Sequence, residues 1–201
     1  MKFLLGTKEK MTQVFNEKGN VVPVTLVNAG PITAVQLKTK EKDGYEATVF
    51  GFGSKKKKNV KKPQRTKGNF RWLKEARFPL GSIASKSAVG DVIDVSVFKE
   101  GDKVLVSGTT KSKGFQGVVK RHGFSGGPRS HGQKHSEREP GSIGAVWPQR
   151  VLKGKRMAGR MGGNRVSVNN LKIIKVDKDK NQILISGAVP GRRGTLLEIK
   201  G

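Results

Sequence analysis

The stretch from Thr110 to Asn164 constrains this chain most, because it cannot fold around a core of its own. It shows neither the period of an amphipathic helix nor the two-residue period of a strand. It is rich in glycine, poor in aliphatic side chains, and carries twelve Lys and Arg against two Glu, with all three histidines of the chain. So little apolar surface cannot offset the entropy lost on folding. We therefore expect a polyanion to order this segment, and its composition makes RNA the first candidate.

The chain as a whole is also strongly basic. Its 201 residues carry a formal net charge of +26, with a pI near 10.6. Self-repulsion at that charge destabilises a compact state unless a partner neutralises it. Nucleic acid, an anionic membrane or an acidic protein could do so. The length allows one domain or two small ones, with an adequate core in the apolar parts.

Targeting and covalent features are few. No run approaches the roughly twenty apolar residues of a transmembrane helix, so we expect no membrane partner. The opening MKFLLG has three apolar side chains after its lysine, fewer than the roughly seven of a signal peptide. We expect a cytoplasmic protein, or one of an organelle matrix if a presequence has been removed. The absence of cysteine excludes disulfides and thiolate metal sites.

The remainder of the chain alternates β-rich runs with turn residues, a pattern that predicts strands. Pro23 lacks a backbone donor, which indicates a sheet edge or a bulge. The best hairpin joins the runs at 92–97 and 103–107 through Glu100-Gly101-Asp102. The full set of runs is 11–15, 21–27, 32–37, 47–52, 92–97, 103–107, 165–168, 171–176, 183–186 and 195–199.

Two blocks of predicted strands bracket the basic stretch. We therefore expect a mainly β fold whose body comprises residues 1–109 and 165–201 and closes into a barrel, which would protect its strand edges. Residues 110–164 would form a long, irregular extension rich in Gly, Lys and Arg. In that extension Gly126-Gly127-Pro128 and Gly162-Gly163 would be bends, because glycine allows positive φ and close backbone approach.

A second basic segment, the loop at 54–78, lies within the predicted body. Cations with interleaved aromatic rings can contact phosphates and stack on bases. Two alternatives remain open: a solvated, mobile loop, or aromatic side chains, Phe70 and Trp72, that anchor the loop to the body. The candidate RNA-binding residues of this loop are Lys55, Lys56, Lys57, Lys58, Lys61, Lys62, Arg65, Lys67, Arg71 and Trp72.

Several short patterns imitate enzyme motifs without completing them. Residues 127–132 and 154–159 have the glycine spacing of a P-loop, but the Lys and Ser or Thr that must follow are missing from both. Serines neighbour histidines in the extension, yet no positioned carboxylate completes a catalytic triad. We expect no enzyme activity, no cofactor and no small-molecule substrate.

The histidines do not predict a metal site. His131 and His135 are four residues apart, a spacing that brings imidazoles together only on a helix, and Gly132 between them disfavours one. The surrounding cations would repel a divalent ion. Hydrogen bonds from these histidines to phosphate or 2′-hydroxyl groups, or stacking on bases, fit the composition better.

Long motifs in the chain resemble a known family. KSKGFQGVVKRHGFSGGPRSHGQKHSEREPGSIG, WPQRVLKGKRMAGRMGGNRVSVNNLKIIKVD and GAVPG closely resemble the universal third protein of the large ribosomal subunit, in its bacterial form. KMTQVF and VVPVTLVNAGP match the opening of that family. The chain departs from the usual pattern at Lys10, Leu105 and Ser112. Val146 stands where some bacterial members have a methylated glutamine, so that modification is not expected here.

The resemblance implies a β-barrel body related to barrels of translation factors and bound to large-subunit rRNA. It also implies an extension that runs inward to the peptidyl transferase centre, with its tip near Trp147 and Pro148. The family acts early in subunit assembly, has ribosomal-protein neighbours and leaves peptide-bond chemistry to the RNA. By this match the rRNA-binding residues are Lys113, Lys120, Arg121, His122, Arg129, His131, Lys134, His135 and Arg138 on one limb, Trp147 at the tip, and Arg150, Lys153, Lys155, Arg156, Arg160 and Arg165 on the other limb.

Two other functions compete with this interpretation. A general DNA-compacting protein would satisfy the charge alone, and it would bind any duplex with similar affinity, whereas the resemblance predicts a preference for one folded RNA. An RNA-modifying enzyme would need a cofactor pocket or a carboxylate–histidine pair, and the sequence offers neither.

Overall fold

A computed structural model describes residues 2–77 and 88–201. Residue 78, the last of the predicted basic loop, lies outside the described residues. The elements in chain order are β1 (Phe3–Phe15), β2 (Val21–Ala29), β3 (Ile32–Lys38), α1 (Lys40–Asp43), β4 (Ala47–Ser54), the 3₁₀ helices η1 (Lys57–Asn59) and η2 (Lys62–Lys67), β5 (Phe70–Ala76), β6 (Val92–Ile93), the 3₁₀ helix η4 (Val95–Val97), β7 (Lys103–Thr109), β8 (Phe115–Gln116), α2 (Val118–His122), β9 (Gly159–Arg160), β10 (Arg165–Asp177), β11 (Gln182–Ser186) and β12 (Leu196–Lys200).

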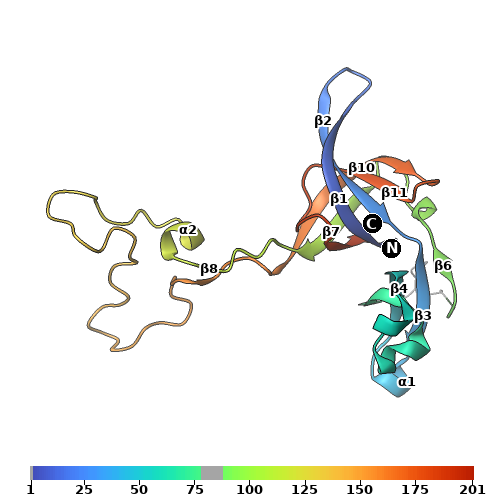
Figure 1. Cartoon of the computed structure of the whole chain (residues 1–201), viewed down its shortest axis with the longest axis horizontal. Helices are drawn as coiled ribbons and strands as arrows, with labels where there is room; N and C mark the ends of the chain where they lie inside the picture. The colour runs from blue at the N-terminus through green and yellow to red at the C-terminus, as the bar shows by residue number, and fades with distance from the viewer. Residues whose placement is uncertain (1, 78–87) are drawn as a thin grey trace. The chain divides into compact units, whose positions relative to one another are not determined.

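Six strands form a closed antiparallel barrel in the order β1-β12-β7-β10-β11-β2. Figure 1 labels β1, β2, β7, β10 and β11 of this barrel. Closure requires distant parts of the sequence to pair, since β1 and β7 both flank the C-terminal strand β12. Each barrel strand thereby has a partner on both sides over at least part of its length, which leaves little free edge. The prediction of a mainly β fold with a barrel body is confirmed.

A four-stranded antiparallel sheet, in the order β5-β4-β3-β6, completes the body. One hydrophobic core is shared by this sheet and the barrel, because buried side chains of both lie in a single cluster. The ring of Phe50 on β4 lies 5.4 Å from that of Phe3 on β1, measured between centroids. Leu4, Ile32 and Ile199 are also fully buried there. Burial on this scale stabilises the body by about 1.5–3 kcal/mol per large side chain.

Strand β2 lies between β1 and β11 in the barrel, although Pro23 led us to expect this strand at a sheet edge or a bulge. The Pro23 carbonyl accepts a hydrogen bond from Gly187 N–H at 2.8 Å, so its nitrogen also faces the β11 side. The β2–β11 ladder begins only at Val24, paired with Ser186. The prediction that this strand lies at a sheet edge is wrong, because β2 pairs with both β1 and β11. The missing donor of Pro23 falls at the end of the β2–β11 ladder, where the Gly187 carbonyl accepts a hydrogen bond from Thr25 Oγ1 at 2.7 Å instead.

The predicted hairpin of 92–97 with 103–107 is wrong. Asp94 interrupts the first run, because its carboxylate accepts a hydrogen bond from Val95 N–H at 2.6 Å and caps η4. Only Val92 and Ile93 remain extended, and they pair with β3 in the four-stranded sheet. β7 instead lies between β12 and β10 in the barrel. Alternation of apolar residues did not reveal which partner each run would take.

The basic loop is shorter than predicted, since the structure places Ser54 at the end of β4 and residues 70–76 in β5. Alternate side chains of β5 explain the difference. Phe70 covers the backbone at Gly51, where a Cβ would lie 2.4 Å from the ring, and Trp72 stacks on Phe52 at 5.6 Å between centroids. These apolar contacts hold the segment on β4 in spite of its cations.

The chain divides into two compact units, residues 1–109 with 165–201, and residues 110–164. The second unit contains only the two-residue pair β8–β9 and the short helix α2, and residues 123–158 form neither helix nor strand. We call residues 110–164 the extension and the other unit the body.

Candidate nucleic-acid interface

Backbone hydrogen bonds hold the two ends of the extension together. Thr110 N–H donates to the Asn164 carbonyl at 2.9 Å, and Lys113 N–H donates to the Met161 carbonyl at 2.9 Å. Met161 N–H donates in turn to the Gly114 carbonyl at 2.9 Å. Gly162 makes this approach possible, because a Cβ there would lie 2.1 Å from the Lys111 carbonyl oxygen, and its φ is +73°. The paired ends form the base of the extension.

Helix α2 follows the base and provides the extension's small apolar contact. Val118 is the one buried residue of 110–164, all of which the structure describes. Arg121 Nη1 donates to the Met157 carbonyl at 2.6 Å, and His122 Nε2 lies 3.0 Å from the same oxygen. Two side chains predicted to bind RNA therefore also tie α2 to the opposite limb. Their roles are at least partly structural.

Beyond α2 the chain turns back through a loop that few contacts hold. Gly127 N–H donates to the Glu137 carbonyl at 2.9 Å, and Arg129 Nε donates to Glu137 Oε1 at 2.7 Å. A Cβ on Gly126 would lie 2.2 Å from the same carbonyl oxygen. The predicted bends at Gly126 and Gly162 thus coincide with positive φ and close backbone approach. His131 also has positive φ, at 59°.

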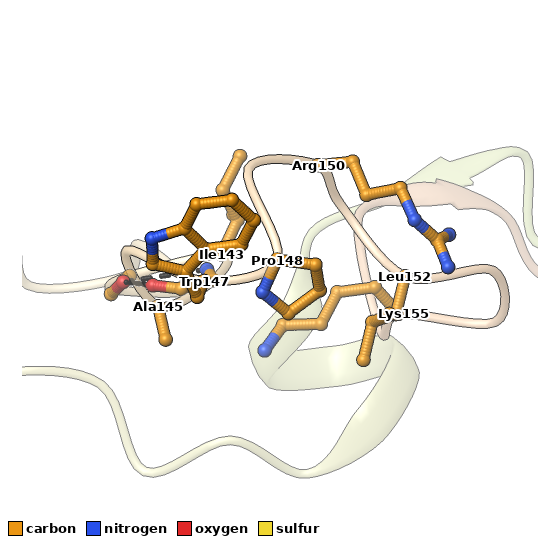
Figure 2. A pocket seen from close by; sticks show the side chains of 9 residues that line it. Ile143, Ala145, Trp147, Pro148, Arg150, Leu152 and Lys155 are labelled. Carbon is orange, nitrogen blue, oxygen red and sulfur yellow. Dashed lines mark hydrogen bonds between the residues drawn. The ribbon is translucent and has the colours of Figure 1, made fainter.

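A shallow hollow of about 350 Å³ lies at the next bend. Its walls include Ile143, Trp147, Pro148 and Leu152, with Lys155 beside them (Figure 2). In that view the Arg150 guanidinium is directed away from Trp147. Trp147 is 77% exposed and Val146 is 80% exposed. Large apolar side chains at such exposure indicate a surface that another molecule covers.

The cations of the extension are almost entirely uncompensated. Arg129 is the one of its twelve Lys and Arg that forms an ion pair within the described residues, and its side chain remains 85% exposed. Clustered, exposed and unpaired cations attract phosphate. Exposed throughout are the predicted residues Lys113, Lys120, Arg129, His131, Lys134, His135, Arg138, Trp147, Arg150, Lys153, Lys155, Arg156 and Arg160.

Arg165 differs from the other predicted residues, because it belongs to β10 of the body. Its Nη2 lies 2.5 Å from Glu198 Oε2 on β12, and Lys74 Nζ lies 3.2 Å from the other oxygen of that carboxylate. Glu198 has a side chain only 14% exposed. This carboxylate, which Arg165 shares with Lys74, offsets part of the charge of Arg165 and ties β10 to β12. Sequence reasoning could not find this, since the two residues are 33 positions apart.

The predicted basic loop of the body retains a cationic surface. Val60 is buried and fixes the segment that contains η1 and η2. Trp72 packs against the core through Phe52, and the Arg71 guanidinium lies 4.3 Å from the centre of the indole. This packing supports the anchoring alternative for Trp72. The exposed cations of the loop are Lys56, Lys57, Lys58, Lys61, Lys62, Arg65 and Arg71, with Lys55 and Lys67 partly covered.

The prediction omitted three further exposed cations, one in the extension and two in the body. Lys111 stands at the base of the extension, beside Lys113. Arg192 and Arg193 lie in the turn before β12, where Gly194 N–H donates to the Lys8 carbonyl at 2.7 Å. An Arg pair between two glycines was a signal for a cationic turn, but only the structure shows that the turn is exposed.

Other kinds of site are poorly supported in the part of the chain that the structure describes. No group of three or more His, Asp or Glu is placed to hold a metal ion there. None of the described helices has the length and apolar character needed to cross a membrane. The exposed cations of the extension, of which only Arg129 has an acidic partner among residues 2–77 and 88–201, favour an interface with an anionic macromolecule.

Known proteins resemble the chain over nearly its whole length. The family described as Ribosomal protein L3 matches residues 54–183. The Large ribosomal subunit protein uL3 of Herpetosiphon aurantiacus is 48% identical over 199 residues, which cover 98% of this chain and 94% of the relative. The proteins of the same name from Desulfitobacterium hafniense and Geobacillus sp. are 47% and 48% identical, over 99% of this chain and 95% of each relative.

These matches confirm the resemblance found in the motifs of the extension and of the first strands. They cover both the barrel body and the extension, because the relatives align with 98% or more of the chain. The chain therefore belongs to the ribosomal protein L3 family, a structural component of the ribosome and not an enzyme.

Proposed function

We propose that this chain, a structural constituent of the large ribosomal subunit, binds large-subunit rRNA through its extension. One observation carries the proposal: eleven of the twelve Lys and Arg of residues 110–164, a fully described range, have no acidic partner, while a single side chain there is buried. A segment with that balance gains its stability from phosphate contacts and not from a core.

The extension would lie between RNA helices, where its cations neutralise crowded phosphates. Its arginines would bind phosphate oxygens through paired N–H groups, and its histidines would hydrogen-bond to phosphates or 2′-hydroxyls. Lowering the repulsion between RNA helices is a contribution to early subunit assembly. The exposed apolar tip with Trp147 and Pro148 would support the RNA of the peptidyl transferase centre, while the RNA itself carries out the chemistry.

The body would bind the surface of the same RNA through its basic loop, with seven exposed cations between Lys56 and Arg71. Other ribosomal proteins of the large subunit would be its protein neighbours. The chain would act in the ribosome of the cytoplasm, with the matrix of an organelle as the alternative location.

Salt dependence of binding tests the proposal. Full-length chain is titrated with large-subunit rRNA and, in competition, with duplex DNA of equal length. With about ten phosphate contacts, we expect log K to fall with log salt at a slope of about −7 to −9, together with a clear preference for the rRNA. Affinity that hardly depends on salt, or equal affinity for both nucleic acids, would contradict the proposal.

Two matched variants separate the extension from the basic loop. One replaces Lys153, Lys155 and Arg156 with Gln, and the other replaces Lys56, Lys57 and Lys58 with Gln. Each replaces three exposed cations, so any effect of net charge alone is equal. Each lost phosphate contact should reduce the slope by about one. We expect the larger loss of affinity for rRNA from the extension variant, because the extension has no core to hold it in place.

A further inference from the structure

The hairpin of β1 and β2 extends beyond the rest of the barrel (Figure 1). Pairing of β1 with β12 ends at Thr7, and pairing of β2 with β11 begins at Val24. From residue 10 to residue 23 the hairpin is therefore a two-stranded ribbon, and its β1 edge has no neighbouring strand among the described residues. A free strand edge is a template for pairing with another chain.

The register shows which backbone groups the free edge presents. The Pro23 carbonyl faces β11 and not β1. The residue of β1 opposite Pro23 therefore directs its N–H and C=O groups away from β2, and so does every second residue of β1 on either side of it. These residues are Met11, Gln13 and Phe15, paired in register with Thr25, Pro23 and Val21. Thr12 and Val14 between them bond to β2. The free edge thus offers three donor and acceptor pairs, enough for a strand of about five residues.

The side chains of the ribbon make the same edge apolar. Met11 and Phe15 are 50% and 65% exposed, and Val21, opposite Phe15, is 52% exposed. Residues opposite each other in an antiparallel pair share a face, so these side chains and the exposed ring of Pro23 lie on one side of the ribbon, with Gln13 as the one polar side chain among them. Contiguous exposed apolar side chains at a free strand edge would favour aggregation unless a partner covers them.

The charge of the ribbon indicates the chemical class of that partner. Residues 9–23 carry two Lys and two Glu, in a chain whose net charge is +26. The extension has twelve Lys and Arg against two Glu. RNA contacts require clustered cations, which this ribbon lacks. Neutral, apolar surface combined with free backbone donors and acceptors fits a protein strand.

We propose that residues 11–15 pair, by strand addition, with a β-strand of another protein of the large ribosomal subunit. The added strand would bond to the outward backbone groups of Met11, Gln13 and Phe15 and cover the apolar face of the ribbon. This inference rests on the proposed function, because it needs the chain to be placed in the large subunit.

Photocrosslinking in the assembled subunit tests the inference. Full-length chains carrying Phe15→p-benzoylphenylalanine or, separately, Arg129→p-benzoylphenylalanine are incorporated into large subunits, irradiated and digested. We expect the probe at position 15 to react with a strand of another ribosomal protein and the probe at position 129 to react with rRNA. Reaction at position 15 mainly with rRNA, or with a second copy of this chain, would overturn the inference while leaving the proposed function intact. Failure of both chains to enter large subunits would overturn both proposals.

Amide hydrogen exchange provides a second, independent test of strand addition. Strand addition should slow exchange at Met11, Gln13 and Phe15 at least about tenfold in the subunit relative to the free chain, because only their N–H groups gain partners. Thr12 and Val14 are internal controls, since β2 already binds their amides in the free chain. Unchanged exchange at the three outward amides would overturn the inference.

A matched pair of variants separates strand pairing at residues 11–15 from nonspecific hydrophobic association. Phe15→Lys and Val89→Lys each place a cation at an apolar side chain of similar exposure, 65% and 62%. We expect Phe15→Lys to abolish the protection of the outward amides in the subunit and to leave rRNA affinity unchanged, with no effect from Val89→Lys. Equal effects of the two variants would overturn the inference.

Discussion

A methyl group at Gly162 should open the base of the extension. This glycine follows Met161, whose N–H and carbonyl both bond across to the other limb, to Gly114 and Lys113. A Cβ at Gly162 would lie 2.1 Å from the Lys111 carbonyl oxygen and 3.1 Å from its carbon. Both contacts are to backbone, so no flexible side chain can move aside. Gly162→Ala must therefore displace one limb from the other.

The size of the effect follows from two terms. A non-glycine residue at the φ of +73° found at Gly162 costs about 1–2 kcal/mol. Displacement of close-packed backbone adds about 1–3 kcal/mol. Gly154→Ala is the matched control, because Gly154 has a φ of +81° but nothing within 4 Å of its would-be Cβ. Only the second term distinguishes the two variants.

Amide exchange at Lys113 and Met161 and affinity for large-subunit rRNA provide the assays. The difference of about 1–3 kcal/mol corresponds to exchange about 5- to 150-fold faster at these two amides in Gly162→Ala than in Gly154→Ala. Affinity should fall by up to the same factor, since the RNA must then restore the closed base. If the two variants matched each other in both assays, close approach of the limbs at Gly162 would be refuted.

Three further predictions concern the core, the charges and the pH response. Val118→Ala should loosen α2 by about 1–2 kcal/mol, seen as faster exchange at the Gly123 amide that caps it, because no other side chain of the extension is buried. Arg138→Gln should reduce the salt slope of rRNA binding by about one, whereas Arg129→Gln should reduce it less if its pairing with Glu137 persists in the complex; equal changes would contradict this. The body should lose stability as pH falls below about 4, measured by thermal unfolding. A hydrogen bond from Lys2, with one from the Lys99 backbone, lowers the pKa of Asp102 below its ordinary 3.8, so its contribution is present above that pH and is lost on protonation; Asp102→Asn should make the loss shallower.

Glu75 should contribute to the same acid response from within the four-stranded sheet. A hydrogen bond from Lys38 lowers the pKa of Glu75 below its ordinary 4.5. In turn, hydrogen bonds with Tyr45 and then Glu75 raise the pKa of Lys38, so this pair stays charged throughout the neutral range. The stabilisation should be complete above about pH 4.5 and lost as pH falls through the lowered pKa of Glu75.

Local patterns predicted most strands but not their partners. The runs at 21–27 and 47–52 became β2 and β4, because β-branched residues and flanking turns act over a few positions. The partner of a strand depends on contacts between distant residues, which is why the run at 103–107 was assigned to a hairpin and not to its place between β12 and β10. The side chain of Asp94 caps η4 and ends the extended run at Ile93, and the alternation of apolar residues does not predict such a cap.

The composition of the extension showed that it lacks a core, and its glycines showed where it bends. Gly126 and Gly162 were identified because close approach and positive φ both require the absence of a side chain. Which candidate residues would have partners in the body was not predictable, because these contacts join residues distant in the sequence. Arg165 pairs with Glu198 and Trp72 stacks on Phe52 only in the folded body. The free edge of β1 could not be predicted from the sequence either, because it exists only where the neighbouring strands of the barrel end.

Amide exchange across residues 123–163, compared between the free chain and the large subunit, tests most directly whether rRNA orders the extension. In the free chain we expect fast exchange along this range and slow exchange in the barrel strands, because the described contacts of the extension lie mainly at its base and at α2. In the subunit the same amides should become protected. Uniform protection of residues 123–163 in the chain without RNA would contradict the dependence of their order on rRNA.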